Sequence, residues 1–277
     1  MYVDLNVRAT ARVSARELQR LGYACVCVNV DCDGSAQQLK SVTALPALPP
    51  SAQEERHDKV AKKAKLYTAV VGKGLQLKDV ETGDSNELPR QRKRITLKIE
   101  EVADAQRLIG LDVVKGYDVV AVEAMTLKVF QFLCEQADID LITFDVTNRI
   151  PFQIKRPLIA AAVKRGVYFE ITYVPCLGDS AGRRYFFSNA SHLVRLTGGK
   201  NLVFSSGATR DILLRSPYDV INIGLLSGLK YGQARDAIST SCLAVLEHAD
   251  RRRGIIGGVQ VEVTKNRAIE SDCPVGS

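Results

Sequence analysis

The sequence of 277 residues has few of the features on which common enzymes depend. Its three histidines are His57, His192 and His248, and none of them stands in an H-x-H or H-E-x-x-H pattern. No C-x-x-C pair occurs either. Imidazole-rich and thiolate-rich metal sites are therefore not expected.

Three short segments contain only fragments of phosphate-binding or nucleophile motifs. Gly72-Lys73-Gly74 and the segment TGGK at 197–200 contain glycine and lysine, but not the spacing of a P-loop or of G-x-G-x-x-G. The segment SSG at 205–207 does not have the pattern G-x-S-x-G, so it gives no support for a serine hydrolase. These fragments are more typical of turns.

Long apolar runs are absent, and none approaches the roughly 18 residues of a membrane span. The first ten residues do not combine a basic start with an apolar run, so no secretory signal is expected. Of the seven cysteines, Cys25 and Cys27 lie inside the apolar run ACVCVNV, which favours buried small side chains over a disulfide framework. We expect a protein of a reducing compartment with no membrane contact.

Short apolar runs alternate with helical patterns along most of the chain. Because this alternation is typical of a parallel sheet, and because eight strands with about 250 residues suit a closed barrel, we predict a single α/β fold of the (β/α)8 TIM-like type. The predicted strands are Tyr2–Val7, Ala24–Val30, Arg94–Ile99, Tyr117–Val122, Asp140–Asp145, Val167–Thr172, Asn201–Ser205 and Asp219–Ile223. The principal predicted helices span 14–21, 102–111, 126–137, 158–163, 185–196 and 231–248.

The alternation is interrupted once. Residues from about 31 to 90 contain a Pro-rich stretch and a charged stretch, and we interpret them as an insertion after the second strand. The barrel is thus assigned to residues 1–250, and residues 251–277 to a surface strand and a loose tail.

Polar residues stand at the carboxyl ends of several predicted strands, where barrel enzymes carry their active sites. They are Asp31, Asp33, Glu123, Asp145, Asn148 and Glu170. Carboxylates grouped in this way can hold a divalent cation or transfer protons, so a metal-dependent hydrolase of phosphate esters remains an alternative.

Positive charge is the other conspicuous feature. The 38 Lys and Arg residues exceed the 31 Asp and Glu residues and give a formal charge of +7. A single basic cluster is usually a solvated face, but several clusters here occupy equivalent places beside helix starts, where anions are favoured. Lys155 and Arg156 stand at the start of the helix after the fifth strand, and Arg183 and Arg184 just before the helix after the sixth. Two adjacent loops can thus present one basic surface to phosphates.

Four segments carry a resemblance to a known family. They are IPFQIKRP, RRY followed by a helix, GKNLVFSS and PYDVINIGLLSGL, together with YVDLNV at the start. With these segments the chain resembles the thirty-kilodalton protein subunit of ribonuclease P, which is shared with ribonuclease MRP. The resemblance covers most of residues 1–250.

The resemblance implies a barrel related to the PHP (polymerase and histidinol phosphatase) metal enzymes without their histidine ligands. It implies a non-catalytic, RNA-binding subunit, with no catalytic residues and no cofactor of its own, in a particle whose catalytic noncoding RNA removes the 5′ leader of precursor tRNA. It further implies Mg²⁺ at that RNA, a Pop5-type protein partner, other subunits, indirect contact with precursor tRNA, and a nuclear, nucleolar location. By the matching motifs, the expected RNA-contacting residues are Lys155, Arg156, Arg183, Arg184 and Lys200, with Arg210 and Arg215 after the seventh strand as further candidates.

Overall fold

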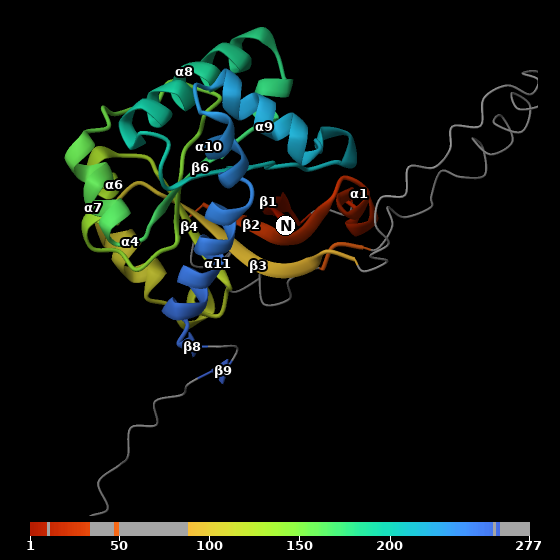
Figure 1. Cartoon of the computed structure of the whole chain (residues 1–277). Coiled ribbons are helices and arrows are strands. Elements are labelled where there is room, and N and C mark those ends of the chain that lie inside the picture. Colours follow the sequence, from red (N-terminus) through yellow and green to blue (C-terminus); the bar gives the residue numbers. More distant parts are fainter. Residues whose placement is uncertain (10–11, 34–46, 50–87, 257–258, 261–277) are drawn as a thin grey trace, which may run out of the picture.

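A sheet of seven parallel strands forms the centre of the protein (Figure 1). The computed structural model describes residues 1–9, 12–33, 47–49, 88–256 and 259–260. The strands lie in chain order: β1 (Tyr2–Arg8), β2 (Tyr23–Cys32), β3 (Arg90–Ile99), β4 (Val119–Ala124), β5 (Leu141–Thr143), β6 (Tyr168–Thr172) and β7 (Leu202–Ser205). Every neighbouring pair is parallel, as the alternation of strands and helices predicts.

Helices connect the strands and surround them. They are α1 (Ala15–Arg20), α4 (Val102–Ile109), α5 (Asp112–Lys115), α6 (Leu127–Glu135), α7 (Arg156–Lys164), α8 (Ser180–Thr197), α9 (Pro217–Leu226), α10 (Tyr231–Asp236) and α11 (Thr240–Arg252), with 3-10 turns η1 (Val174–Leu177) and η2 (Asp211–Leu213). Side-chain caps explain several starts: the Ser14 hydroxyl accepts the Glu17 N–H, and the Thr126 hydroxyl accepts the Val129 N–H.

The prediction of an eighth strand at Asp219–Ile223 is wrong, because these residues lie inside α9. The local chemistry favours a helix: the Ser216 hydroxyl caps the Asp219 N–H at 3.3 Å, and Pro217 occupies the first helical position. Buried Val220, Ile221 and Gly224 then recur at helical spacing. A five-residue apolar run is compatible with a strand or a helix, and here the Ser216 cap favours the helix.

Backbone from the chain between two helices takes the place of the missing strand. The N–H groups of Val3 in β1 and Phe204 in β7 donate to the carbonyls of Ile238 and Ala237, at 3.0 and 2.9 Å. The prediction of one continuous helix over 231–248 is therefore wrong. The chain forms two helices, α10 and α11, and the residues between them lie in this gap. Further along, the Gly207 N–H donates to the Asn6 carbonyl at 2.8 Å, and the barrel is nearly closed.

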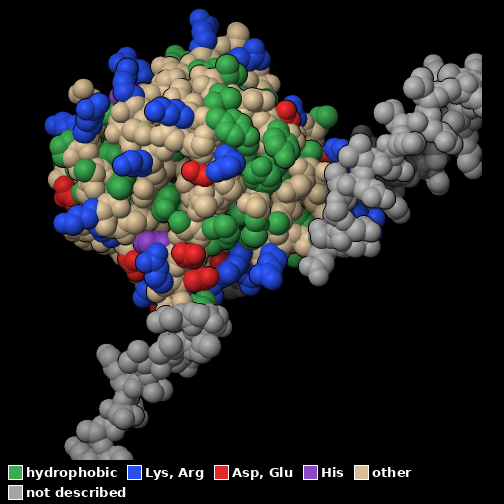
Figure 2. All heavy atoms as spheres, viewed as in Figure 1, with side chains coloured by type: hydrophobic (Ala, Val, Ile, Leu, Met, Phe, Trp, Pro, Cys, Tyr) green, Lys and Arg blue, Asp and Glu red, His purple; other side chains and the backbone are tan. Residues whose placement is uncertain are grey.

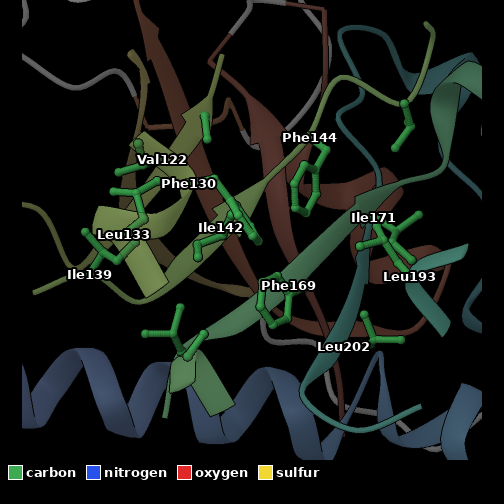
Figure 3. Close-up of a cluster of buried hydrophobic side chains, with 14 of the residues drawn as sticks. Val122, Phe130, Leu133, Ile139, Ile142, Phe144, Phe169, Ile171, Leu193 and Leu202 are labelled. Atoms are coloured by element: carbon green, nitrogen blue, oxygen red, sulfur yellow. The ribbon is translucent and has the colours of Figure 1, made fainter. Parts of the chain in front are cut away.

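Three groups of buried apolar side chains hold the barrel together, and one of them joins α1 to β1 and β2. Between the strands and the outer helices, Phe130 of α6 packs with Phe169 of β6 and with Phe144, and Figure 3 shows these rings facing one another. Inside the barrel, residues of β1, β2, β4, β5, β6 and β7 pack against buried side chains of α11, which lies in front of the strands in Figure 1. This packing leaves the carboxyl ends of the strands as the exposed end of the barrel.

The cysteine prediction is confirmed for the described part of the chain, where Cys25 and Cys27 are buried and free. Most of the predicted insertion, and residues 261–277 of the predicted tail, lie outside the described residues. Of the insertion, Leu48 is buried, and its N–H donates to the side-chain oxygen of Gln91 at 2.8 Å. Beyond α11, β8 (Ile255–Ile256) and β9 (Val259–Gln260) form a small antiparallel pair.

Candidate nucleic-acid interface

The strand-end carboxylate Glu170 belongs to the interior of the barrel. It is fully buried with Arg94, which donates from Nη2 to Oε2 at 2.5 Å, and it accepts the Ser205 hydroxyl at 2.6 Å. Burial alone would raise the pKa of Glu170, but the charge of Arg94 and these hydrogen bonds hold it below its usual range. Glu170 is thus an ionised partner of Arg94 and has no surface open to a substrate.

Three of the other strand-end carboxylates, Asp31, Glu123 and Asp145, line a pocket of about 210 Å³ at the mouth of the barrel. Cations share this pocket with them: Arg8 is paired with Asp31, and the charge of Lys98 acts on both Glu123 and Asp145. Burial raises the pKa of Glu123. Burial acts in the same direction on Asp145, but hydrogen bonds from Thr147 and Asn148 lower its pKa overall.

These contacts do not suit a metal centre. Among the described residues no three His, Cys, Asp or Glu side chains are grouped so that they could hold a metal ion. Arg8 and Lys98 partly offset the charge of Asp31, Glu123 and Asp145, and the Asp145 oxygens accept hydrogen bonds from Thr147 and Asn148. The donor set therefore gives the metal-hydrolase alternative no support.

One further enzyme-like pattern lies between β6 and α8. Residues Gly178 to Gly182 read GDSAG, the spacing of a nucleophile elbow. In the structure Ser180 is the first residue of α8, and Asp179 caps the helix by accepting the Gly182 N–H at 2.8 Å. Within the described part of the chain no histidine is bonded to Ser180, so the segment serves as a helix start.

Many of the arginines have structural partners. Arg92 pairs with Asp250 at 3.0 Å, Arg252 with the buried Asp140 at 3.0 Å, and Arg253 with Asp118. Arg165 instead donates to the Leu133 carbonyl at 3.0 Å and to the Ala137 carbonyl at the end of α6. The basic clusters at 90–94, 164–165 and 251–253 are thus largely used by the fold.

The seven predicted RNA-contacting residues behave differently. In the described part of the molecule none of them forms a salt bridge, whereas the structural arginines named above, except Arg165, do. Six of the seven lie on the loops or helix starts that follow β5, β6 and β7, at the mouth of the barrel. The seventh, Lys200, precedes β7 and so lies at the opposite end, as predicted.

The positions within these loops are partly as predicted. Lys155 is the N-cap of α7 and Arg156 its first residue, which confirms their place at a helix start. The prediction that Arg183 and Arg184 precede the next helix is wrong. They lie in its first two turns, because the cap formed by Asp179 starts α8 at Ser180. Both arginines are exposed.

Two of the basic loops converge on Cys176 of η1. The side chain of Arg183 donates to the Cys176 carbonyl at 3.1 Å, and that of Arg215 donates to the Leu214 carbonyl at 2.7 Å. Burial raises the pKa of the Cys176 thiol, and the charges of both Arg183 and Arg215 act against this shift. The structure therefore brings these two cations, which are 32 positions apart in the sequence, close to one thiol.

Two further cations were not among the predicted residues. Arg149, on the loop after β5, and Arg195, on α8, line one pocket together with His192. The signal in the sequence was the spacing of Arg184, Ser188, His192 and Arg195, which places them along one side of a helix.

An exposed apolar patch lies on α9 and α10. It consists of Tyr218, Leu225, Leu226 and Tyr231, of which Leu226 is 71% exposed. Figure 2 shows apolar side chains gathered over α9 and α10. The ring of Tyr218 also packs edge-on against Tyr2, with 6.0 Å between centroids.

Comparisons with known proteins agree with one another. The family model described as RNase P subunit p30 matches residues 1–254. The mouse (Mus musculus) ribonuclease P protein subunit p30 is 42% identical over 159 residues, which cover 57% of this chain and 59% of the mouse protein. The probable ribonuclease P protein subunit 3 of Schizosaccharomyces pombe is 30% identical over 91% of this chain and 95% of its own length.

A solved structure shares the fold. A chain from a cryo-EM structure of archaeal ribonuclease P with mature tRNA has a TM-score of 0.61 and 14% identity, and the match covers 96% of this chain and 99% of the archaeal one. In the described residues no helix is long and apolar enough to span a membrane.

Proposed function

Because the chain belongs to the family of the ribonuclease P subunit p30, we propose that it is a non-catalytic, RNA-binding protein subunit of the ribonuclease P or ribonuclease MRP ribonucleoprotein. The family predicted from the sequence is confirmed. In the proposed role, the chain supports a catalytic noncoding RNA that removes the 5′ leader of precursor tRNA. The chain spans 59% of the mouse relative's length, so its role in the whole particle is part of the proposal.

The observation that carries the proposal is the group of unpaired cations at the mouth of the barrel. Lys155, Arg156, Arg183, Arg184, Arg210 and Arg215 come from three successive loops, and none has a carboxylate partner among the described residues. Cations that are not neutralised within a protein attract phosphates, and binding then releases counterions from the RNA. We propose that these six residues contact the RNA backbone, and that Lys200 makes a separate contact at the other end of the barrel.

Such contacts position RNA and carry no bond-breaking group. Cationic side chains between RNA segments offset the repulsion of their phosphates, which favours a compact catalytic RNA. The pocket at the mouth is consistent with this role, because Arg8 and Lys98 partly offset the charge of its carboxylates. We propose that the Mg²⁺ of the particle belongs to its RNA and not to this chain.

Within the particle we propose a Pop5-type protein subunit as a direct partner. The support is the apolar patch on α9 and α10, since exposed aromatic and aliphatic clusters of this kind are typical of protein interfaces. The patch residues are not among the proposed RNA contacts, so we propose that protein and RNA bind at the same time. A nuclear, nucleolar location is proposed on the family alone.

The test is to purify the tagged chain from its own cells at moderate salt, to sequence the RNA that is retained, and to assay the eluate on precursor tRNA. One structured noncoding RNA, with cleavage that is lost when this RNA is digested, is the expected result. Recovery of the partner proteins without RNA would contradict RNA binding and leave a protein scaffold. Phosphatase activity that needs added metal, without RNA, would favour the strand-end carboxylates.

A further inference from the structure

A second basic site lies between the loop after β5 and α8, in a pocket of about 770 Å³. One wall is the loop between β5 and α7, and the other is the exposed side of α8. The lining residues are Arg149, Ile150, Pro151, Phe152 and Gln153 from the loop, and Ser188, Asn189, His192 and Arg195 from the helix. The volume lies within the range of about 300–1,000 Å³ found for small-molecule pockets.

The loop wall is fixed by contacts behind it. The buried side chain of Asn189 donates to the Asn148 carbonyl at 2.8 Å and so joins the loop to α8. Asp145 accepts the Thr147 N–H at 2.9 Å, which forms a local turn before the pocket. Phe152 packs against Phe130 of the core, with ring centroids 5.3 Å apart. A pocket held in this way needs little ordering when a ligand binds.

The charge of the pocket is entirely positive. It is lined by no carboxylate, and within the described residues neither Arg149 nor Arg195 forms a salt bridge, although both are exposed. His192 also lines the pocket. Burial lowers the pKa of its ring, and the charge of Arg195 lowers it further. The pocket lining thus supplies positive charge and no negatively charged side chain to offset it.

Its other lining groups are those that contact a nucleoside. Phe152 supplies an aromatic ring, and the side-chain amide of Gln153 can donate to and accept from the edge of a base. Proteins recognise RNA sequences mainly through unpaired nucleotides, whose bases stack on aromatic rings and whose edges form hydrogen bonds. A double helix cannot present a base in this way.

We propose that this pocket binds one unpaired nucleotide of the RNA, with its phosphate between Arg149 and Arg195 and its base toward Phe152 and Gln153. The inference rests on the proposed RNA-binding function and adds to it a site for single-stranded RNA. The pocket and the predicted interface share one side of α8. Arg184 of the interface and Ser188, His192 and Arg195 of the pocket recur along that side at helical spacing.

The test compares two RNA probes on the full-length chain: a single-stranded oligonucleotide and a blunt duplex that contains it. Two exposed arginines are replaced in Arg149→Ala/Arg195→Ala. The affinity for the single strand should fall by about tenfold or more, since each charge-assisted contact contributes at least that much, whereas affinity for the duplex should change less than about twofold. The slope of log K against log salt should decrease by about 0.7, the value for one phosphate on a single strand.

Three controls separate the outcomes. Arg107→Ala/Lys115→Ala removes the same charge from exposed residues that pair within their own helices, and it should leave both affinities unchanged. Arg149→Lys/Arg195→Lys keeps the charge and should keep the salt slope. Arg183→Ala/Arg184→Ala tests the proposed interface and should weaken both probes.

An equal loss for both probes in Arg149→Ala/Arg195→Ala would overturn the pocket and leave only a general basic surface. No loss in that variant, with a loss in Arg183→Ala/Arg184→Ala, would overturn the pocket and keep the proposed function. Failure of the unchanged chain to bind either probe would overturn both. Ultraviolet cross-linking in the purified particle should join RNA to the 149–153 loop, and a cross-link of that loop to protein alone would also overturn the proposal.

Discussion

Replacing Glu170 by glutamine should destabilise the fold without a specific effect on RNA processing. Glu170 stands at a strand end, where a barrel enzyme would place a catalytic carboxylate, but it is fully buried against Arg94. Removing one partner of a buried ion pair costs about 3–5 kcal/mol, because the other charge is left uncompensated. Arg94 keeps only neutral partners in this variant, namely Thr96 at 3.2 Å and the Leu5 carbonyl at 2.7 Å.

The assay is urea unfolding of the isolated chain followed by circular dichroism. Glu170→Gln should reduce the free energy of unfolding by about 3–5 kcal/mol, whereas Arg94→Met/Glu170→Leu should recover much of the loss, since no buried charge remains. Particles that still assemble with Glu170→Gln at low temperature should cleave precursor tRNA at the ordinary rate per particle. A change below about 1 kcal/mol, or a loss of cleavage in intact particles, would refute a purely structural role.

The same pair predicts a dependence on pH. The pKa of Glu170 is lowered in the folded chain, so its stabilising contribution is present above the pKa of the unfolded state. It is lost as the pH falls through the lower, folded value. Glu170→Gln should therefore lose less stability than the unchanged chain in this acid range, and equal losses in both would contradict the assignment.

Three more predictions follow from other contacts. Arg183→Ala/Arg184→Ala should weaken binding to single-stranded RNA and reduce the salt slope by about 1.4, the value for two phosphates, and an unchanged slope would exclude both residues from the interface. Burial raises the pKa of Asp4 above 3.8, so wild-type stability should fall as the pH rises through the folded value, and Asp4→Asn should remove this dependence in a urea titration at several pH values. Leu226→Asp should release the Pop5-type subunit from purified particles while RNA remains bound, and Val113→Asp, an exposed apolar control on α5, should release nothing.

Seven strands could be predicted from the sequence because each is an apolar or alternating run bounded by turn residues. The eighth could not, because Asp219–Ile223 has the composition of a strand and its helical state depends on Ser216 and Pro217, which precede it. Ala237 and Ile238 take the place of that strand, because their carbonyls accept hydrogen bonds from N–H groups of β7 and β1. Backbone hydrogen bonds of this kind leave no trace in the pattern of side chains.

The candidate site was predictable only in part, for a related reason. A basic residue looks the same in sequence whether or not it has a carboxylate partner, and the partners here are distant along the chain: Arg94 and Glu170 are 76 positions apart, and Arg252 and Asp140 are 112 apart. The fold decides which arginines are neutralised. The arginines with carboxylate partners have to be set aside first. The remaining cations then include the six at the mouth, and Arg149 and Arg195 of the second basic site.

In the proposed role, the separation of paired and unpaired cations explains how this barrel can position an RNA without acting on it. Carboxylates at a barrel mouth attract divalent ions less strongly when nearby cations offset their charge, as Arg8 and Lys98 do in part here. The same cations reduce the repulsion that a phosphate backbone meets at the rim. Replacing Lys98 by alanine would remove a charge that offsets Glu123 and Asp145, and by the same reasoning it should weaken RNA binding.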